Sequence, residues 1–347
     1  MRTIRSLAIC LIGCLALPAH SAEFTQLSDQ PISFDDSYAG RCTHRMEGEI
    51  VAGDAGKLAT MIANLPAQDH DDMNFILCMN STGGRLEEGL KIGALLQDNF
   101  FGTHVPKGSI CLSACAVAFM HGTIAAWEFF VNFRMLHPQA LLGFHAPSLS
   151  ISANADQMVP YALVDSAYQA TMQTIADIVA GASKPVSEFA SPIIPLSLLS
   201  TMLATEAEEF YYVETLHDAF RWDIDIFPQG LTAPQGFDID VGLFQMCENA
   251  AYEITPDAFG EEIPRAITAN DVEHGQVGYG WRVDMPSDHK LLSLMNIFNR
   301  QCSYKYLPDR DYFVLNRYVD GKLEREVYLP SVYLFAPETL LADIAPQ

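Results

Sequence analysis

Apolar and polar positions follow two alternating periods along the first two thirds of the chain. Short apolar runs have the length of strands, and the segments between them repeat apolar residues every three or four positions, as amphipathic helices do. We place strands at 46–51, 75–79, 103–105 and 140–145, and helices starting at Asp54 as its capping residue, over 85–99 and over 111–119. Continuous apolar strands alternating with helices predict the α/β class, with a mainly parallel sheet and crossover helices.

The pattern changes after residue 226. A helix over 157–181, a strand over 208–213 and a helix with an exit strand over 214–226 precede a Pro- and Gly-rich break at 227–236. Beyond the break, residues 310–329 alternate around an Asp320-Gly321 turn signal and predict a hairpin. We therefore expect an α/β domain over 41–228 and a smaller C-terminal α+β domain of unassigned role over 237–347, preceded by a loosely held leader over 23–40.

The first 22 residues have the features of a secretory signal peptide. Arg2 and Arg5 are followed by the apolar run "LAICLIGCLAL" and by small residues over 19–22. A lipoprotein box at Cys14 is less favoured, because few apolar residues precede it and the run continues past it. No later apolar run reaches the length of a membrane-spanning helix. We expect an exported protein, periplasmic or secreted.

Charge and cysteine content support export and narrow the partners. The formal charge is −23, or about −25 without Arg2 and Arg5, and acidic residues are spread along the chain, which disfavours nucleic acid and anionic lipid as partners. Six cysteines follow the leader, an even number that suggests disulfides: Cys42, Cys78, Cys111, Cys115, Cys247 and Cys302. We expect a Cys247–Cys302 bond, and leave open whether Cys111 and Cys115 pair with each other or with Cys78. No spacing predicts a metal site, and no cofactor is expected.

Three motifs carry candidate chemistry. Ser113, in "CLSAC", stands at a predicted helix start, where free amides would stabilise an oxyanion, although a capping serine would look the same. Gly83 and Gly84, in "NSTGG", follow a buried strand and expose backbone amides. His145 ends the strand "ALLGFH" and could act as a general base, with His137 as a rival. A thiolate nucleophile at Cys111 or Cys115 is disfavoured, because an oxidising compartment would oxidise it.

The order of these motifs resembles the Clp-protease and crotonase-like superfamily, most closely its exported, periplasmic Clp-protease-like branch. The resemblance covers about 41–228 and implies a (ββα)-spiral fold. Matched residue by residue, it implies Ser113 as nucleophile, His145 as base, and Gly83 or Gly84 with Ala114 as oxyanion-hole donors. The run "PQALLGFH" favours His145 over His137.

Two features depart from the family pattern. The triad acid is unresolved: Glu208 or Glu209 falls where the family carries its aspartate, Asp165 is a less favoured substitute, and a serine–histidine dyad is the remaining option. The insertion "TIAAWEFFVNF" over 123–133 separates the serine helix from the histidine strand, and its aromatics suit a lid, a trimer contact or core. The superfamily also implies trimer-based homo-oligomers.

These observations predict an exported, ATP-independent serine hydrolase that acts on peptide or protein substrates. An esterase would use the same groups. The alternative from another class is a non-catalytic binding or scaffold protein on the same fold. A coenzyme-A-dependent reaction is disfavoured, because that cofactor is cytoplasmic.

Overall fold

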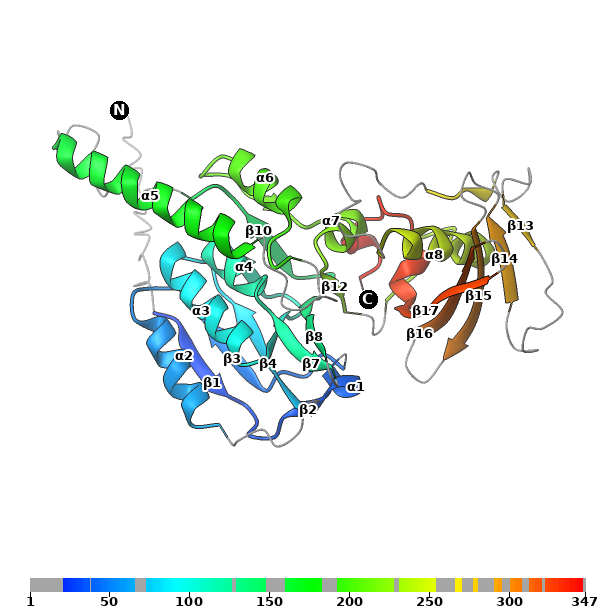
Figure 1. Ribbon diagram of the computed structural model, residues 1–347, viewed down its shortest axis with the longest axis horizontal. Helices are drawn as coiled ribbons and strands as arrows, with labels where there is room; N and C mark the ends of the chain where they lie inside the picture. Colours follow the sequence, from blue (N-terminus) through cyan, green and yellow to red (C-terminus); the bar gives the residue numbers. More distant parts are fainter. Residues whose placement is uncertain are drawn as a thin grey trace, which may run out of the picture.

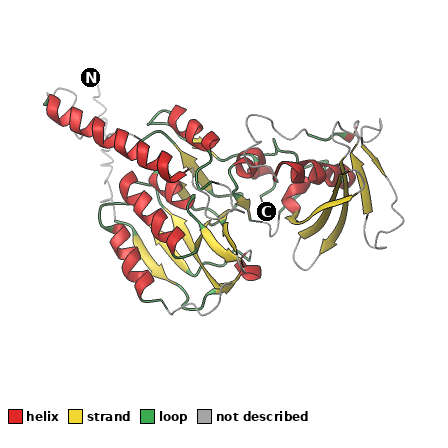
Figure 2. Cartoon of the chain, viewed as in Figure 1, coloured by secondary structure: helices red, strands yellow, loops and turns green. Residues whose placement is uncertain are grey.

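The computed structural model describes residues 21–37, 39–65, 73–126, 129–147, 160–182, 192–227, 231–253, 266–269, 277–279, 290–294, 300–307, 312–319 and 322–345. They form a mixed α/β unit with a mainly parallel central sheet and a separate, smaller unit built on an antiparallel sheet (Figures 1 and 2). This confirms the α/β class and the change of architecture after the Pro- and Gly-rich break. The (ββα)-spiral itself stays a prediction.

The central sheet has the strand order β1-β3-β4-β5-β9-β12, with β2 paired to β4. The strands from β3 to β12 in this order are parallel to one another and span His44–Glu47, Met73–Asn80, Phe101–Val105, Arg134–Leu136 and Asp225–Ile226. Helix α2 (Asp54–Ala63) connects β3 to β4, and α3 (Leu86–Asp98) connects β4 to β5. Phe75, Leu77 and Phe101 are fully buried, as continuous apolar strands covered by helices require.

Two short strands within residues 23–33 belong to this sheet, contrary to the expectation of a loose leader over 23–40. Strand β1 (Glu23–Gln26) pairs antiparallel with β3, and β2 (Ile32–Ser33), followed by α1 (Phe34–Ser37), pairs with β4. Both strands are too short to show a period in the sequence. Their backbone hydrogen bonds to β3 and β4 hold them in place.

Two local expectations at the start of α2 were wrong. The strand expected over 46–51 ends at Glu47, and Ile50 makes only an isolated bridge to Gly84. Gly53, with φ 98°, occupies the helix cap position that the sequence assigned to Asp54. The Asp54 carboxylate instead accepts hydrogen bonds from the Val51 and Ala22 amides.

A second, three-stranded sheet has the order β11-β10-β6. Strands β6 (Ile110–Leu112) and β10 (Leu141–Phe144) are parallel, and β11 (Tyr211–Tyr212) is antiparallel to β10. The helix expected over 111–119 is therefore two elements, β6 and α4 (Ala114–Phe119), with Ser113 between them. The strand expected over 208–213 shrinks to the two residues of β11.

The insertion over 123–133 forms a hairpin of β7 (Thr123–Ala126) and β8 (Phe129–Asn132) before β9. Phe133 is fully buried and packs in a small core cluster, whereas Phe129 and Phe130 are exposed. Phe130 stacks on Phe100, with ring centroids 4.4 Å apart. Of the three roles left open for these aromatics, core packing holds for Phe133.

Three helices complete the α/β unit: α5 (Tyr161–Ala182), α6 (Leu196–Ala204) and α7 (Leu216–Arg221). Helix α5 extends outward from the body of the unit (Figure 1). It exposes apolar side chains, including Tyr161, Leu163 and Tyr168. Residues 157–159 of the expected helix lie outside the described residues. The trimer-based assembly stays a prediction.

The smaller unit consists of α8 (Ile239–Glu253) beside a five-stranded antiparallel sheet whose strands follow chain order (Figure 1). These are β13 (Val277–Tyr279), β14 (Lys290–Leu294), β15 (Arg300–Leu307), β16 (Tyr312–Val319) and β17 (Lys322–Pro330), followed by 3-10 helices Ser331–Leu334 and Leu341–Asp343. The Val319↔Lys322 pair confirms the predicted hairpin, although Asp320 and Gly321 lie outside the described residues. The terminal segment returns to the α/β unit, where Leu216 donates its amide to the Thr339 carbonyl at 3.1 Å.

Three disulfides join Cys42 to Cys78, Cys111 to Cys115 and Cys247 to Cys302. The expected Cys247–Cys302 bond is confirmed, and Cys111 pairs with Cys115 rather than with Cys78. Three such pairs are compatible with an oxidising compartment.

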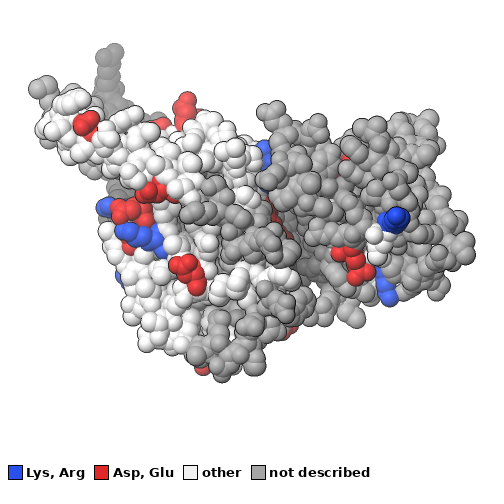
Figure 3. Space-filling model, in the orientation of Figure 1, with Lys and Arg blue, Asp and Glu red and all other residues white. Residues whose placement is uncertain are grey.

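Hydropathy and surface charge also bear on the expected partners. Among the described helices, none combines the length and apolar character that crossing a membrane would require. Among the described residues on the face shown, acidic side chains are scattered, some beside lysine or arginine, rather than gathered in one patch (Figure 3).

Candidate active site

Ser113 lies at a sharp turn between β6 and α4. Its φ is 55° and its ψ is −123°, a backbone conformation that residues other than glycine rarely adopt. Its side chain makes no capping hydrogen bond to the helix. The interpretation of Ser113 as an ordinary helix cap therefore fails. The strained turn instead leaves Ser113 partly buried, with its hydroxyl directed toward a histidine.

That histidine is His145, whose Nε2 lies 2.7 Å from the Ser113 Oγ. The pairing of β6 with β10 explains the contact. Leu112 and Gly143 are partners in the parallel ladder, and the Ser113 amide donates to the Gly143 carbonyl at 3.0 Å. Ser113 and His145 each follow the carboxyl end of one of these strands, so both side chains emerge at the same edge.

Phe210 supports the His145 ring from one side. The two rings are in edge contact, with centroids 4.8 Å apart. The main chain next to His145 is held as well, because the Ala146 amide donates to the Thr205 carbonyl at 3.1 Å. These contacts restrict the rotation of the imidazole. No property of the sequence marked Phe210 beforehand, since its contact with His145 depends on the β10–β11 pairing.

The diglycine segment lies against the serine turn. Gly83 has a φ of 92°, and a Cβ at this position would overlap the Leu112 carbonyl and lie 2.7 Å from the Ser113 Cβ. Only glycine fits there. The Gly83 amide donates to the Ser81 Oγ at 3.1 Å, and the Gly83 carbonyl accepts from the Ile50 amide at 2.7 Å. The fully buried Ser81 thus fixes the bend, a role that the sequence analysis missed.

Gly84 and Ala114 offer the two other amides at this place. Ile50 and Gly84 form a parallel bridge. The Ile50 amide donates to the Gly83 carbonyl, and the Ile50 carbonyl accepts from the Arg85 amide. In a bridge of this kind the Gly84 amide points away from Ile50. Ala114 is the first residue of α4, where helix geometry leaves the amide without an intrahelical partner. A Cβ on Gly83 would lie 3.1 Å from this nitrogen, which shows how closely the bend approaches it.

Ser113, His145 and Gly84 all line one open pocket of about 490 Å³. Its walls include Thr171 and Thr174 of α5. The pocket is large enough for an extended side chain or a short segment of chain, and it combines polar and apolar walls.

No acid completes the pair among the described residues. The Nδ1 of His145 is buried and has no hydrogen-bond partner in the described part of the chain. Glu208 and Glu209 are exposed on the turn before β11, and Asp165 is exposed on α5. None of the three carboxylates is hydrogen-bonded to His145. The described geometry is that of a dyad.

The rival groups have other contacts. The Nδ1 of His137 accepts a hydrogen bond from the Gln139 amide at 3.0 Å, and its ring stacks on Phe227. Burial, aided by the charge of Lys107, lowers the pKa of His137. Cys111 and Cys115 are bonded to each other and offer no thiolate. Cys42, Cys78 and His104 lie close enough together to suggest a metal cluster, but the two sulfurs are joined in a disulfide.

Comparison with known proteins leaves the family open. No family model matches the chain, and no curated protein matches it. A solved structure that matches is a mutant of 1510-N, a membrane-bound stomatin-specific protease, at 12% sequence identity and a TM-score of 0.33, over 52% of this chain and 76% of that one. A TM-score this low carries no inference. The structure itself is that of a mixed α/β protein in which Ser113 and His145 are in contact at the edge of a small sheet.

Proposed function

We propose that the protein is an exported, ATP-independent serine hydrolase that cleaves peptide bonds, with Ser113 as nucleophile and His145 as general base. The observation that carries this is the 2.7 Å contact between Ser113 Oγ and His145 Nε2 beside glycine-bounded amides. A serine hydroxyl at hydrogen-bond distance from an imidazole is the arrangement that nucleophilic acyl transfer needs. The leader-like first 22 residues and the three disulfides support export.

The reaction would have two halves, formation of an acyl-enzyme and its hydrolysis, and Ser113 and His145 would act in both. Ser113 Oγ attacks the acyl carbon while His145 Nε2 takes its proton, and the imidazolium then gives that proton to the leaving group. Water repeats the sequence to release the acyl group. The amides of Gly84 and Ala114 are the oxyanion donors we favour, because the Gly83 amide is already committed to Ser81. Losing one donor typically costs about 10²–10³ in rate.

A non-catalytic binding protein is the second candidate. The Nδ1 of His145 has no hydrogen-bond partner among the described residues, which favours this candidate, because a triad acid normally fixes the tautomer and stabilises the imidazolium. The same pocket would then hold a peptide without cleaving it.

Digestion of a peptide library, analysed by mass spectrometry, distinguishes the hydrolase from the binding protein. The mature protein should generate new termini, and Ser113→Ala and His145→Ala should each abolish them. Ser28→Ala, a change at a partly exposed serine in a surface turn, is the matched control and should cleave like the native protein. Cleavage that persists in Ser113→Ala, or new termini that never form, would contradict the proposal.

A further inference from the structure

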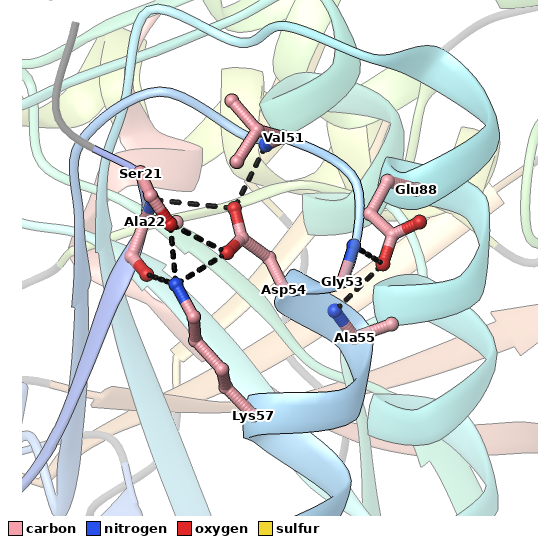
Figure 4. A network of polar contacts seen from close by, with 8 residues as sticks. All are labelled: Ser21, Ala22, Val51, Gly53, Asp54, Ala55, Lys57 and Glu88. Carbon is pink, nitrogen blue, oxygen red and sulfur yellow. Dashed lines mark hydrogen bonds and ion pairs between the residues drawn. The ribbon is translucent and has the colours of Figure 1, made fainter.

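The main-chain nitrogen of Ala22 lies against a buried carboxylate (Figure 4). It donates to Asp54 Oδ2 at 3.2 Å, and the Ala22 carbonyl accepts from Lys57 Nζ at 3.1 Å. Ala22 is completely buried within the main hydrophobic core, and no part of the Asp54 side chain is exposed. A residue at the edge of the predicted leader is thus built into the folded molecule.

Three other groups contact the Asp54 carboxylate. It accepts hydrogen bonds from the Val51 amide at 2.8 Å, the Ser21 hydroxyl at 2.8 Å and Lys57 Nζ at 2.7 Å. Lys57 is half-exposed, whereas a second carboxylate, Glu88, is buried next to the same turn and accepts from the Gly53 and Ala55 amides. Buried carboxylates are costly unless cations or amides surround them. Glu88 also lies 3.7 Å from Lys91 Nζ, so Lys57 is the one cation in contact with Asp54 among the described residues.

The sequence places a cleavage pattern at this point. Leader peptidases select small residues at the first and third positions before the bond they cut. Cutting after Ser21 puts Ser21 and Ala19 at these positions. Cutting after Ala22, the limit that the leader pattern suggested, would put His20 at the third position and would remove a fully buried residue.

We propose that a leader peptidase hydrolyses the Ser21–Ala22 bond and that Asp54 binds the new α-ammonium of Ala22 as an ion pair. Water adds its hydroxyl to the Ser21 carbonyl carbon and one hydrogen to the Ala22 nitrogen, and Ser21 departs as a carboxylate with the leader. The amine takes a second proton from solvent at neutral pH. Its extra N–H groups replace the hydrogen bond that the Ser21 hydroxyl gave to Asp54, and charge makes the contact stronger.

The ammonium site also joins the N-terminus to the diglycine bend. Asp54 holds the Val51 amide, and the preceding residue, Ile50, bonds to Gly83 at 2.7 Å and to Arg85 at 2.8 Å. Binding of the N-terminal ammonium to Asp54 would stabilise the Ile50–Val51 segment. The proposal stands whether or not Ser113 is a nucleophile.

The first test is the N-terminus of the mature protein. The full-length chain is exported from its own leader, purified and digested, and its N-terminal peptide is identified by mass spectrometry. We expect a free amine on Ala22. A mature chain that begins at any other residue would overturn the proposal.

The second test measures the ion pair. Inserting one alanine between Ser21 and Ala22 keeps the cleavage pattern but leaves an extra residue, so the ammonium no longer reaches Asp54. The melting temperature should fall by a few degrees. In an Asp54→Asn background, the native and the alanine-inserted N-termini should give the same melting temperature. In a Glu23→Gln background, a matched change at an exposed carboxylate, the difference in melting temperature should remain. Equal melting temperatures for the proteins with and without the inserted alanine, when Asp54 is present, would refute the ion pair.

Discussion

Ser113 adopts a backbone conformation that costs about 1–3 kcal/mol for a residue with a side chain. Local sequence does not explain it, since a serine before "ACAVAF" is free to cap the helix. The surroundings impose it: the Ser113 amide donates to the Gly143 carbonyl, and Gly83 packs so closely that a Cβ there would lie 2.7 Å from the Ser113 Cβ. This strain thus falls on the residue whose hydroxyl faces the imidazole.

Replacing Gly83 with alanine tests how tightly the bend fits. The new Cβ would overlap the Leu112 carbonyl at a positive φ, so Gly83→Ala should lower the free energy of unfolding and displace Ser113. Gly108→Ala is the matched control, because Gly108 also has a positive φ, 72°, but no atom within 4 Å of the added Cβ. The control should cost only about 1 kcal/mol. Denaturant unfolding that ranks the two variants equally would show that Gly83 is not sterically required.

At the scale of the elements, two disulfides have different tasks. Cys111–Cys115 closes a short loop around Ser113, from β6 to α4, whereas Cys247–Cys302 joins α8 to β15 across 55 residues. Chain entropy alone assigns about 2 kcal/mol to the first bond and about 4 kcal/mol to the second.

Removing each bond by paired alanine substitutions should separate stability from geometry. Cys111→Ala with Cys115→Ala should cost less free energy of unfolding but slow the reaction of Ser113 with an acylating probe. Cys247→Ala with Cys302→Ala should cost more stability and leave that reaction unchanged. Denaturant unfolding and the rate of Ser113 labelling are measured on both double variants. A larger loss of stability without Cys111–Cys115, or slower labelling without Cys247–Cys302, would contradict this prediction.

Sequence patterns predicted the elements that have a clear period and missed those that long-range pairing creates. The buried strand at 75–79 and the helix over 85–99 follow from local apolar spacing, and β4 and α3 confirm them. Strand β1 has no such signal, since its partner β3 lies some 20 residues away. The contact of Ser113 with His145 could be anticipated from motif order. The absence of an acid beside His145 Nδ1 among the described residues could not, because it depends on where the chain places Glu208 and Glu209.

At the scale of the whole molecule, buried histidines set the response to acid. Burial lowers the pKa of His44, His104 and His121 from 6.5 to about 4, and the charges of His137 and Arg134 add to the effect at His104 and His121. The unfolded chain therefore binds more protons than the folded chain between these values. The stability that these groups contribute is present above pH 6.5 and is lost as the pH falls toward 4.

The free energy of unfolding should accordingly decrease between pH 6.5 and pH 4, by at most about 3 kcal/mol for each histidine. Urea titrations across this range measure it. His121→Gln should make the dependence shallower, because one titrating group is lost. A native profile that stays level down to pH 4.5 would show that these histidines are not protonated on unfolding.

The central claim is that Ser113 is activated by His145, and labelling with a fluorophosphonate tests it without knowledge of a substrate. The purified mature protein should form one covalent adduct, mapped to Ser113 by mass spectrometry. His145→Ala should slow its formation by at least about 100-fold, and His217→Ala should leave the rate unchanged. Well-folded native protein that remains unlabelled, or that reacts at Ser113 equally fast without His145, would contradict the account.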